Sequence, residues 1–72
     1  MMGALAVTVT SYGEGRQSVL LARSEATVGD AVKRTGYSTD GRRIALNGQR
    51  AGAGAGVQEG DLVTLMPRVV GG

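Results

Sequence analysis

The last apolar run of the chain reads Leu62-Val63-Thr64-Leu65-Met66-Pro67. Apolar side chains occupy both alternating positions of this run, which is typical of a central strand that is covered on both faces. Pro67 lacks the backbone N–H that a ladder hydrogen bond requires, so we expect the strand to end there. Glu59-Gly60-Asp61 precedes the run and predicts a turn. The sequence therefore predicts a central strand over residues 62–66.

Two more strands are predicted near the N-terminus. In residues 5–12, valines alternate with threonines, and this period of two is the pattern of a strand. Residues 13–16 contain two glycines and predict a tight turn, and a second apolar run follows over residues 17–22. Two such runs separated by a short turn predict an antiparallel hairpin.

A short helix is predicted over residues 28–35. Thr27 places a hydroxyl three residues before the carboxylate of Asp30, a pattern that resembles a capping box. Gly36 is suited to the left-handed position that commonly follows a helix. One face of the predicted helix is formed by Val28, Ala31, Val32 and Thr35.

The region between this helix and the last strand predicts a second, shorter hairpin. Residues 43–46 form a short strand with Ile44 and Leu46 directed inward, and Asn47-Gly48 is a strong type I′ turn signal before a return strand at residues 49–50. Residues 51–56 alternate alanine and glycine. They have almost no side chain to bury, and they predict a flexible loop or one turn of irregular helix.

The order of these elements predicts an α+β fold of the β-grasp (ubiquitin-like) type. We expect a mixed sheet of four to five strands, with one short helix packed on one face and the first strand paired with the last. The helix crossover between them should be right-handed. The expected organisation is a β-grasp domain over residues 1–66 and a flexible C-terminal diglycine tail over residues 67–72.

The composition excludes several kinds of site. A chain of 72 residues makes one domain of marginal stability. It contains no cysteine and no histidine, which excludes disulfides, the common zinc sites and the usual pairing of nucleophile and base. We therefore expect no metal site and no enzymatic activity of its own.

Charge and hydropathy argue against two kinds of partner, nucleic acids and membranes. The net charge is +2, the basic residues are dispersed, and two tyrosines are the only aromatic residues, so we expect no nucleic-acid partner. No apolar run approaches the ~20 residues that span a bilayer, and no secretory signal is recognisable at the N-terminus. The sequence predicts a cytoplasmic protein without a membrane partner.

The candidate functional residues lie after the last strand, at Gly71-Gly72. Two residues without a Cβ make a thin segment that adopts backbone angles closed to other residues. Such a segment can thread a narrow channel and present its carboxylate to an activating enzyme. The alternative is chance, because glycine makes up 13 of the 72 residues.

These features together resemble the MoaD/ThiS sulfur-carrier family of the ubiquitin-like β-grasp group. The similarity lies in Ile44-Ala45-Leu46-Asn47-Gly48, in the segment from Val57 to Pro67, and in Val69-Val70-Gly71-Gly72. Many members of that family carry a second proline where Arg68 stands here. Arg68 instead resembles the arginine-bearing tails of ubiquitin-like modifiers.

The resemblance implies a carrier protein that is acted on by an E1-like adenylating enzyme. That enzyme would use ATP to adenylate the carboxylate of Gly72, and this chain would bind no cofactor itself. Conversion to a thiocarboxylate would then let it donate sulfur to a biosynthetic enzyme, with the free carrier monomeric. Gly71 and Gly72 would be the reactive end, and the residues that contact the partner would be Pro67, Arg68, Val69 and Val70.

Two other functions stay open at this point. The chain could be a ubiquitin-like modifier that forms isopeptide bonds to lysine, or a β-grasp binding subunit that is never activated. The first predicts adducts that are lost when Gly72 is deleted, and the second predicts full function in a chain truncated at Val70.

Overall fold

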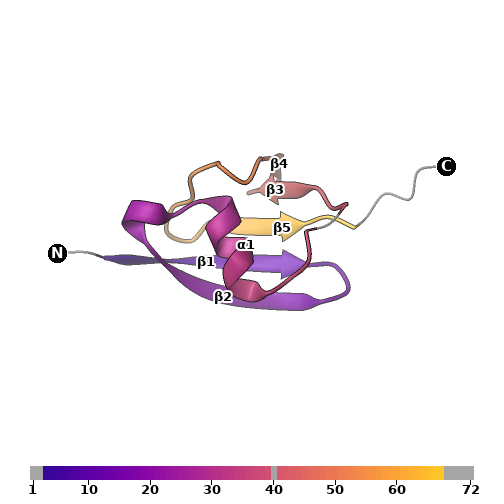
Figure 1. Ribbon diagram of the computed structural model, residues 1–72, viewed down its shortest axis with the longest axis horizontal. Helices are drawn as coiled ribbons and strands as arrows, with labels where there is room; N and C mark the ends of the chain where they lie inside the picture. The colour runs from indigo at the N-terminus through magenta and orange to yellow at the C-terminus, as the bar shows by residue number, and fades with distance from the viewer. Residues whose placement is uncertain (1–2, 40, 68–72) are drawn as a thin grey trace.

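The computed structural model describes residues 3–39 and 41–67, apart from the side chain of Glu25. Over these residues the chain forms a five-stranded sheet, one α-helix and one short 3₁₀ helix (Figure 1). The elements are β1 (Ala4–Ser11), β2 (Gly15–Ala22), η1 (Arg23–Glu25), α1 (Val28–Thr35), β3 (Ile44–Leu46), β4 (Gln49–Arg50) and β5 (Leu62–Leu65).

The sheet has the strand order β2-β1-β5-β3-β4. The first and last strands, β1 and β5, are parallel neighbours, with Val9 opposite Val63, and the other neighbouring strands are antiparallel. Figure 1 shows β1 and β5 pointing the same way beneath α1. The α+β class, the mixed sheet and the pairing of first strand with last are those of the β-grasp fold, which confirms the expectation from the sequence.

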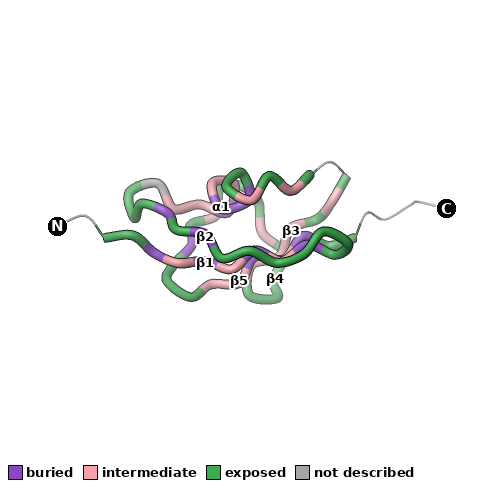
Figure 2. Tube along the Cα trace, turned by 90° about the horizontal axis from the view of Figure 1, so that it is seen from below, coloured by how far each residue is buried: buried purple, intermediate pink, exposed green. Residues whose placement is uncertain are grey.

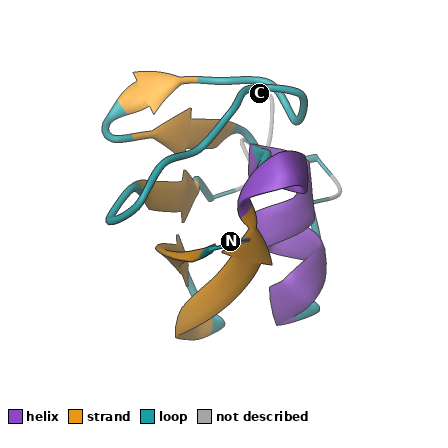
Figure 3. Cartoon of the chain, turned by 90° about the vertical axis from the view of Figure 1, so that its left-hand side faces the viewer, coloured by secondary structure: helices purple, strands orange, loops and turns teal. Residues whose placement is uncertain are grey.

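The hydrophobic core lies between α1 and one face of the sheet. Along β1, Leu5, Val7 and Val9 are buried while the intervening side chains are half-buried or exposed. In Figure 2 the buried residues gather between the helix and the strands, and Figure 3 shows the helix on one side of the sheet. The core therefore has two layers, as expected for one short helix on one sheet face.

The expectation that the last strand is covered on both faces was wrong. Val63 and Leu65 are fully buried, but Leu62 is half-buried and Met66 is exposed. α1 covers only the face that carries Val63 and Leu65, so the outer side chains of β5 are left without a second layer. The strand also ends at Leu65, one residue earlier than predicted.

The helix has the predicted boundaries, and both predicted caps are present. Thr27 Oγ1 accepts a hydrogen bond from the backbone N–H of Asp30 at 3.2 Å and donates one to the Asp30 carboxylate at 3.0 Å. Gly36 follows the helix in the left-handed conformation, with φ of 77°. Asn47 and Gly48, with φ of 51° and 85°, likewise fit the predicted type I′ turn, in which both central residues have positive φ.

The alanine-glycine segment at 51–56 is not the flexible loop that its composition predicted. The carbonyls of Ala53 and Ala55 accept hydrogen bonds from the N–H groups of Gly29 and Val28, at 2.8 Å and 2.9 Å. These donors belong to the first turn of α1 and have no partner within the helix. Side-chain-poor residues suit this role because they let the segment approach the helix closely, and at 51–56 its backbone caps α1.

We expect Gly29→Val to destabilise the protein by about 1–3 kcal/mol, because the added side chain overpacks this junction. A Cβ at position 29 would lie 3.1 Å from the carbonyl oxygen of Ala53 and 3.3 Å from its Cβ. Urea unfolding of the variant and the wild type measures the loss. Gly52→Val is the matched control, since a Cβ there meets nothing within 4 Å. Equal stability of the two variants would contradict the capping role.

Candidate functional site

The chain leaves the sheet where β5 ends, and this exit is the candidate functional site. The N–H of Met66 donates a hydrogen bond to the carbonyl of Arg43 at 2.8 Å, which fixes the backbone one residue beyond the strand. Met66 and Pro67 are both exposed. Because β5 is parallel to β1, the exit lies at the same end of the sheet as the turn between β1 and β2 (Figure 1).

A hydrogen-bonded cluster of Ser11, Glu14 and Arg42 holds this end of the sheet together. The guanidinium of Arg42 donates to the Ser11 hydroxyl and forms an ion pair of 2.6 Å with Glu14, while Ser11 Oγ donates to the same carboxylate at 2.9 Å. Ser11 is buried, so its hydroxyl needs these partners. The cluster ties the β1–β2 turn to the segment that accepts the Met66 hydrogen bond, and it thereby positions the exit.

The opposite end of β5 is fixed by Asn47 and Asp61. The Asn47 amide donates to the Asp61 carboxylate at 3.0 Å and accepts from the N–H of Leu62 at 2.9 Å. Asp61 also accepts the N–H of Gln58 at 2.8 Å. The hydrogen bond from Asn47, followed by that from Gln58, lowers the pKa of the Asp61 carboxyl below its ordinary value. Asp61 therefore stabilises the turn that leads into β5, as its position in the sequence suggested.

We expect Asp61→Asn to weaken the pH dependence of stability in acid. A carboxyl with a lowered pKa in the folded state contributes stability above its unfolded pKa, near 3.8, and loses it as the pH falls through the folded pKa. The free energy of unfolding of the wild type should therefore exceed that of the variant most above about pH 5, and this difference should shrink below about pH 4. Urea unfolding across this range measures it. An unchanged difference at low pH would contradict the role of Asp61.

The structure describes one of the six residues predicted for the site. Pro67 lies exposed at the exit, directly after the last anchored residue, while Arg68, Val69, Val70, Gly71 and Gly72 lie outside the described residues. Sequence reasoning missed the cluster around Arg42, whose members are separated by up to 31 residues and carry no local pattern.

Two classes of feature are absent from the described part of the chain. Within residues 3–39 and 41–67, no group of acidic side chains is arranged to hold a metal ion. In the same residues, no helix has the length and apolar character that a membrane crossing requires.

The fold is shared with several small archaeal proteins of solved structure. SAMP1 from Haloferax volcanii superposes with a TM-score of 0.73 at 22% identity, over 93% of this chain and 99% of SAMP1. A protein named molybdopterin converting factor, subunit 1, from Pyrococcus furiosus superposes with a TM-score of 0.68 at 22% identity, over 90% of this chain and 99% of that one.

A third match is a ubiquitin from Caldiarchaeum subterraneum, with a TM-score of 0.58 at 22% identity, over 97% of this chain and all of that one. No protein-family model matches the sequence, and no curated protein matches it. At this level of identity the structural matches establish the β-grasp fold. They also confirm, at the level of fold, the resemblance to MoaD-type proteins.

Proposed function

We propose that the protein is a sulfur carrier whose reactive group is the carboxylate of Gly72. The observation that carries the proposal is the exit at Pro67. The sheet's central strand ends at the surface there, and residues 68–72 follow, ending in the diglycine. The match to a molybdopterin converting factor subunit along nearly the whole of both chains adds support.

The chemistry requires activation by another protein. A carboxylate is a poor electrophile because its negative charge repels nucleophiles and it offers no leaving group. Transfer of AMP from ATP to the Gly72 carboxylate, with loss of pyrophosphate, would make a mixed anhydride. Attack by hydrosulfide would then form the C–S bond, break the bond to AMP and leave a thiocarboxylate. We propose an E1-like enzyme as the source of the ATP and magnesium site.

The residues of the tail would have two roles, entry into the activating enzyme and contact with it. Gly71 and Gly72 would enter the activating enzyme's channel, since neither has a Cβ to obstruct it. Pro67, Arg68, Val69 and Val70 would contact the partner on the way in, with the two valines suited to pair along a partner's strand. The anchor at Met66 would give the tail a fixed origin relative to the sheet.

Intact-mass measurement tests this function. The protein would be incubated with ATP, sodium sulfide and candidate E1-like enzymes, with a reaction lacking sulfide as control. We expect the mass gain that corresponds to replacing one oxygen by sulfur, located on Gly72 by fragmentation. If the adenylate forms but no sulfur is incorporated, the carrier function is wrong.

A second candidate function, protein modification, has its own support. One structural neighbour is a ubiquitin, and Arg68 precedes the valines and glycines as in arginine-bearing modifier tails. In that case the activated Gly72 carbonyl would be attacked by a lysine amine, forming an isopeptide bond and releasing the activating group. The same mass measurement, made on a cell extract supplied with the protein, would then show adducts on lysine in place of a thiocarboxylate.

A further inference from the structure

The outer edge of β2 is a second candidate interaction surface, separated from β5 and its exit by β1. β2 is the terminal strand in the order of the described sheet, and its eight residues, Gly15–Ala22, include no proline. Leu20 is 64% exposed there, the largest exposed fraction among the large hydrophobic residues of the described chain. Natural sheets normally protect such an edge, because its unpaired backbone groups readily pair with another strand.

The register shows which backbone groups of β2 are free to pair. The carbonyl of Ala6 accepts a hydrogen bond from the N–H of Gly60 at 2.8 Å, and the N–H of Thr8 donates one to the carbonyl of Asp61 at 3.0 Å. Both residues therefore direct their backbone groups away from β2, toward the turn before β5. Successive strand residues alternate, so Val7 directs its groups toward β2, where Val19 lies opposite. The residues of β2 that alternate with Val19 therefore direct their N–H and C=O groups outward. They are Arg16, Ser18, Leu20 and Ala22.

A hollow of about 260 Å³ runs beside this edge, between β2 and α1. It is lined by Leu21 and Ala22 from the strand and by Asp30, Lys33 and Arg34 from the helix. Further along β2, the side-chain amide of Gln17 donates to the Thr35 carbonyl at 3.0 Å and joins the strand to the end of α1. A strand added to β2 would direct every second side chain into this hollow.

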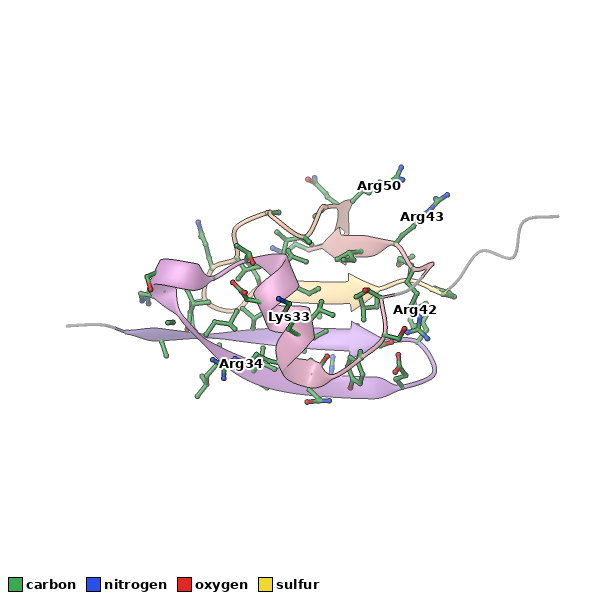
Figure 4. All side chains as sticks on the ribbon, viewed as in Figure 1. Lys33, Arg34, Arg42, Arg43 and Arg50 are labelled. Atoms are coloured by element: carbon green, nitrogen blue, oxygen red, sulfur yellow. The ribbon has the colours of Figure 1, made fainter. Side chains whose placement is uncertain are left out.

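The charges around the hollow favour an acidic occupant. Lys33 and Arg34 are exposed on α1, and Figure 4 shows Arg34 lying beside β2. Asp30 is the one carboxylate of the lining, and it is held by Thr27 at the helix N-terminus. Arg16 on the same strand adds a further exposed cation at the other end of the edge. The lining and the strand together carry an excess of positive charge.

We propose that the β2 edge binds an extended acidic segment of a partner protein by strand addition. Its backbone would pair with Ser18 and Leu20, its apolar side chains would pack beside Leu20 on the outer face, and its alternate acidic side chains would reach Lys33 and Arg34. This interaction goes beyond the proposed carrier function. It needs neither ATP nor Gly72, so its test is independent of that function.

A second copy of this chain fits the edge less well. Pairing β2 with β2 would bring the cations Arg16, Lys33 and Arg34 of each copy near those of the other. Like charges across such an interface oppose association. The acidic partner is therefore favoured over self-association.

NMR titration with designed peptides tests the proposal. The probe is a peptide of alternating glutamate and valine that matches β2 in length, and the comparison peptide alternates lysine and valine. We expect the acidic peptide to shift the amide signals of Ser18 and Leu20 and to slow their hydrogen exchange, and the basic peptide to have no effect. Binding should weaken as salt is raised, because exposed charges are screened beyond about 10 Å at 0.1 M.

Two variants locate the contact. Arg34→Glu should weaken binding of the acidic peptide by roughly tenfold, because an attraction becomes a repulsion. Arg50→Glu is the matched control on β4, at the far edge of the sheet, and should change it less than about twofold. Ser18→Pro, which removes one outward N–H and is tolerated on an edge strand, should also abolish the shifts.

Three outcomes would overturn the proposal. They are equal binding of both peptides, shifts confined to β3 and β4, and concentration-dependent shifts at β2 in the absence of peptide, which would indicate self-association.

Discussion

Leu65→Ala is expected to remove a large part of the protein's stability. Leu65 is fully buried on the central strand β5, where it pairs with Ser11 on one side and Ile44 on the other. A buried leucine truncated to alanine typically costs about 2–5 kcal/mol, through lost burial and the cavity left behind. A domain of this size has a total stability of roughly 4–11 kcal/mol. The variant should therefore be markedly less stable than the wild type, and at the lower end of that range it would be marginal or unfolded.

Thermal and urea unfolding measure this effect. A loss of about 3 kcal/mol corresponds to a fall of roughly 12–24 °C in the melting temperature of a domain this small. Leu20→Ala is the matched control, because it removes the same atoms from a side chain that is 64% exposed. Its effect should stay within about 0.5 kcal/mol. Similar losses in both variants would mean that the core is not centred on β5.

The sequence predicted the fold well where the determinants are local. Thr27 and Gly36 mark the ends of α1 through hydrogen bonds and backbone angles that involve only neighbouring residues. Asn47-Gly48 similarly determines the β3–β4 turn. The alternation in β1 identified a strand correctly, because period two is a property of the strand itself.

Predictions failed where the partner is distant in sequence. The segment 51–56 predicted a flexible loop or a turn of irregular helix because it has almost no side chain to bury, yet its carbonyls cap a helix that begins at Val28. The cluster around Arg42 and the exposure of Met66 depend likewise on how α1 and the strands come together. Sequence patterns over neighbouring residues do not show contacts between segments that are distant in the sequence. For the candidate site, the sequence predicted the end of the strand to within one residue but not what holds the exit in place.

Gly71→Val is expected to reduce thiocarboxylate formation by about 100-fold or more. If Gly72 is activated in a narrow channel, the residue before it must pass through the same channel. A β-branched side chain there would displace the carboxylate from the ATP phosphate, and misplacement by about 1 Å can cost that much in rate. Folding should be unaffected, because the buried hydrophobic side chains of the described residues all lie between Leu5 and Leu65.

The measurement is the rate of sulfur incorporation by intact mass, using an adenylating enzyme that accepts the wild-type chain. Gly54→Val is the matched control, since it makes the same change at an exposed position where a Cβ meets nothing within 4 Å. It should react at the wild-type rate, while unfolding curves show both variants folded. Wild-type rates for Gly71→Val would show that the activating enzyme does not require a residue without a Cβ at position 71. The narrow-channel explanation would then be wrong, whereas sulfur incorporated at Gly72 would still identify its carboxylate as the reactive group.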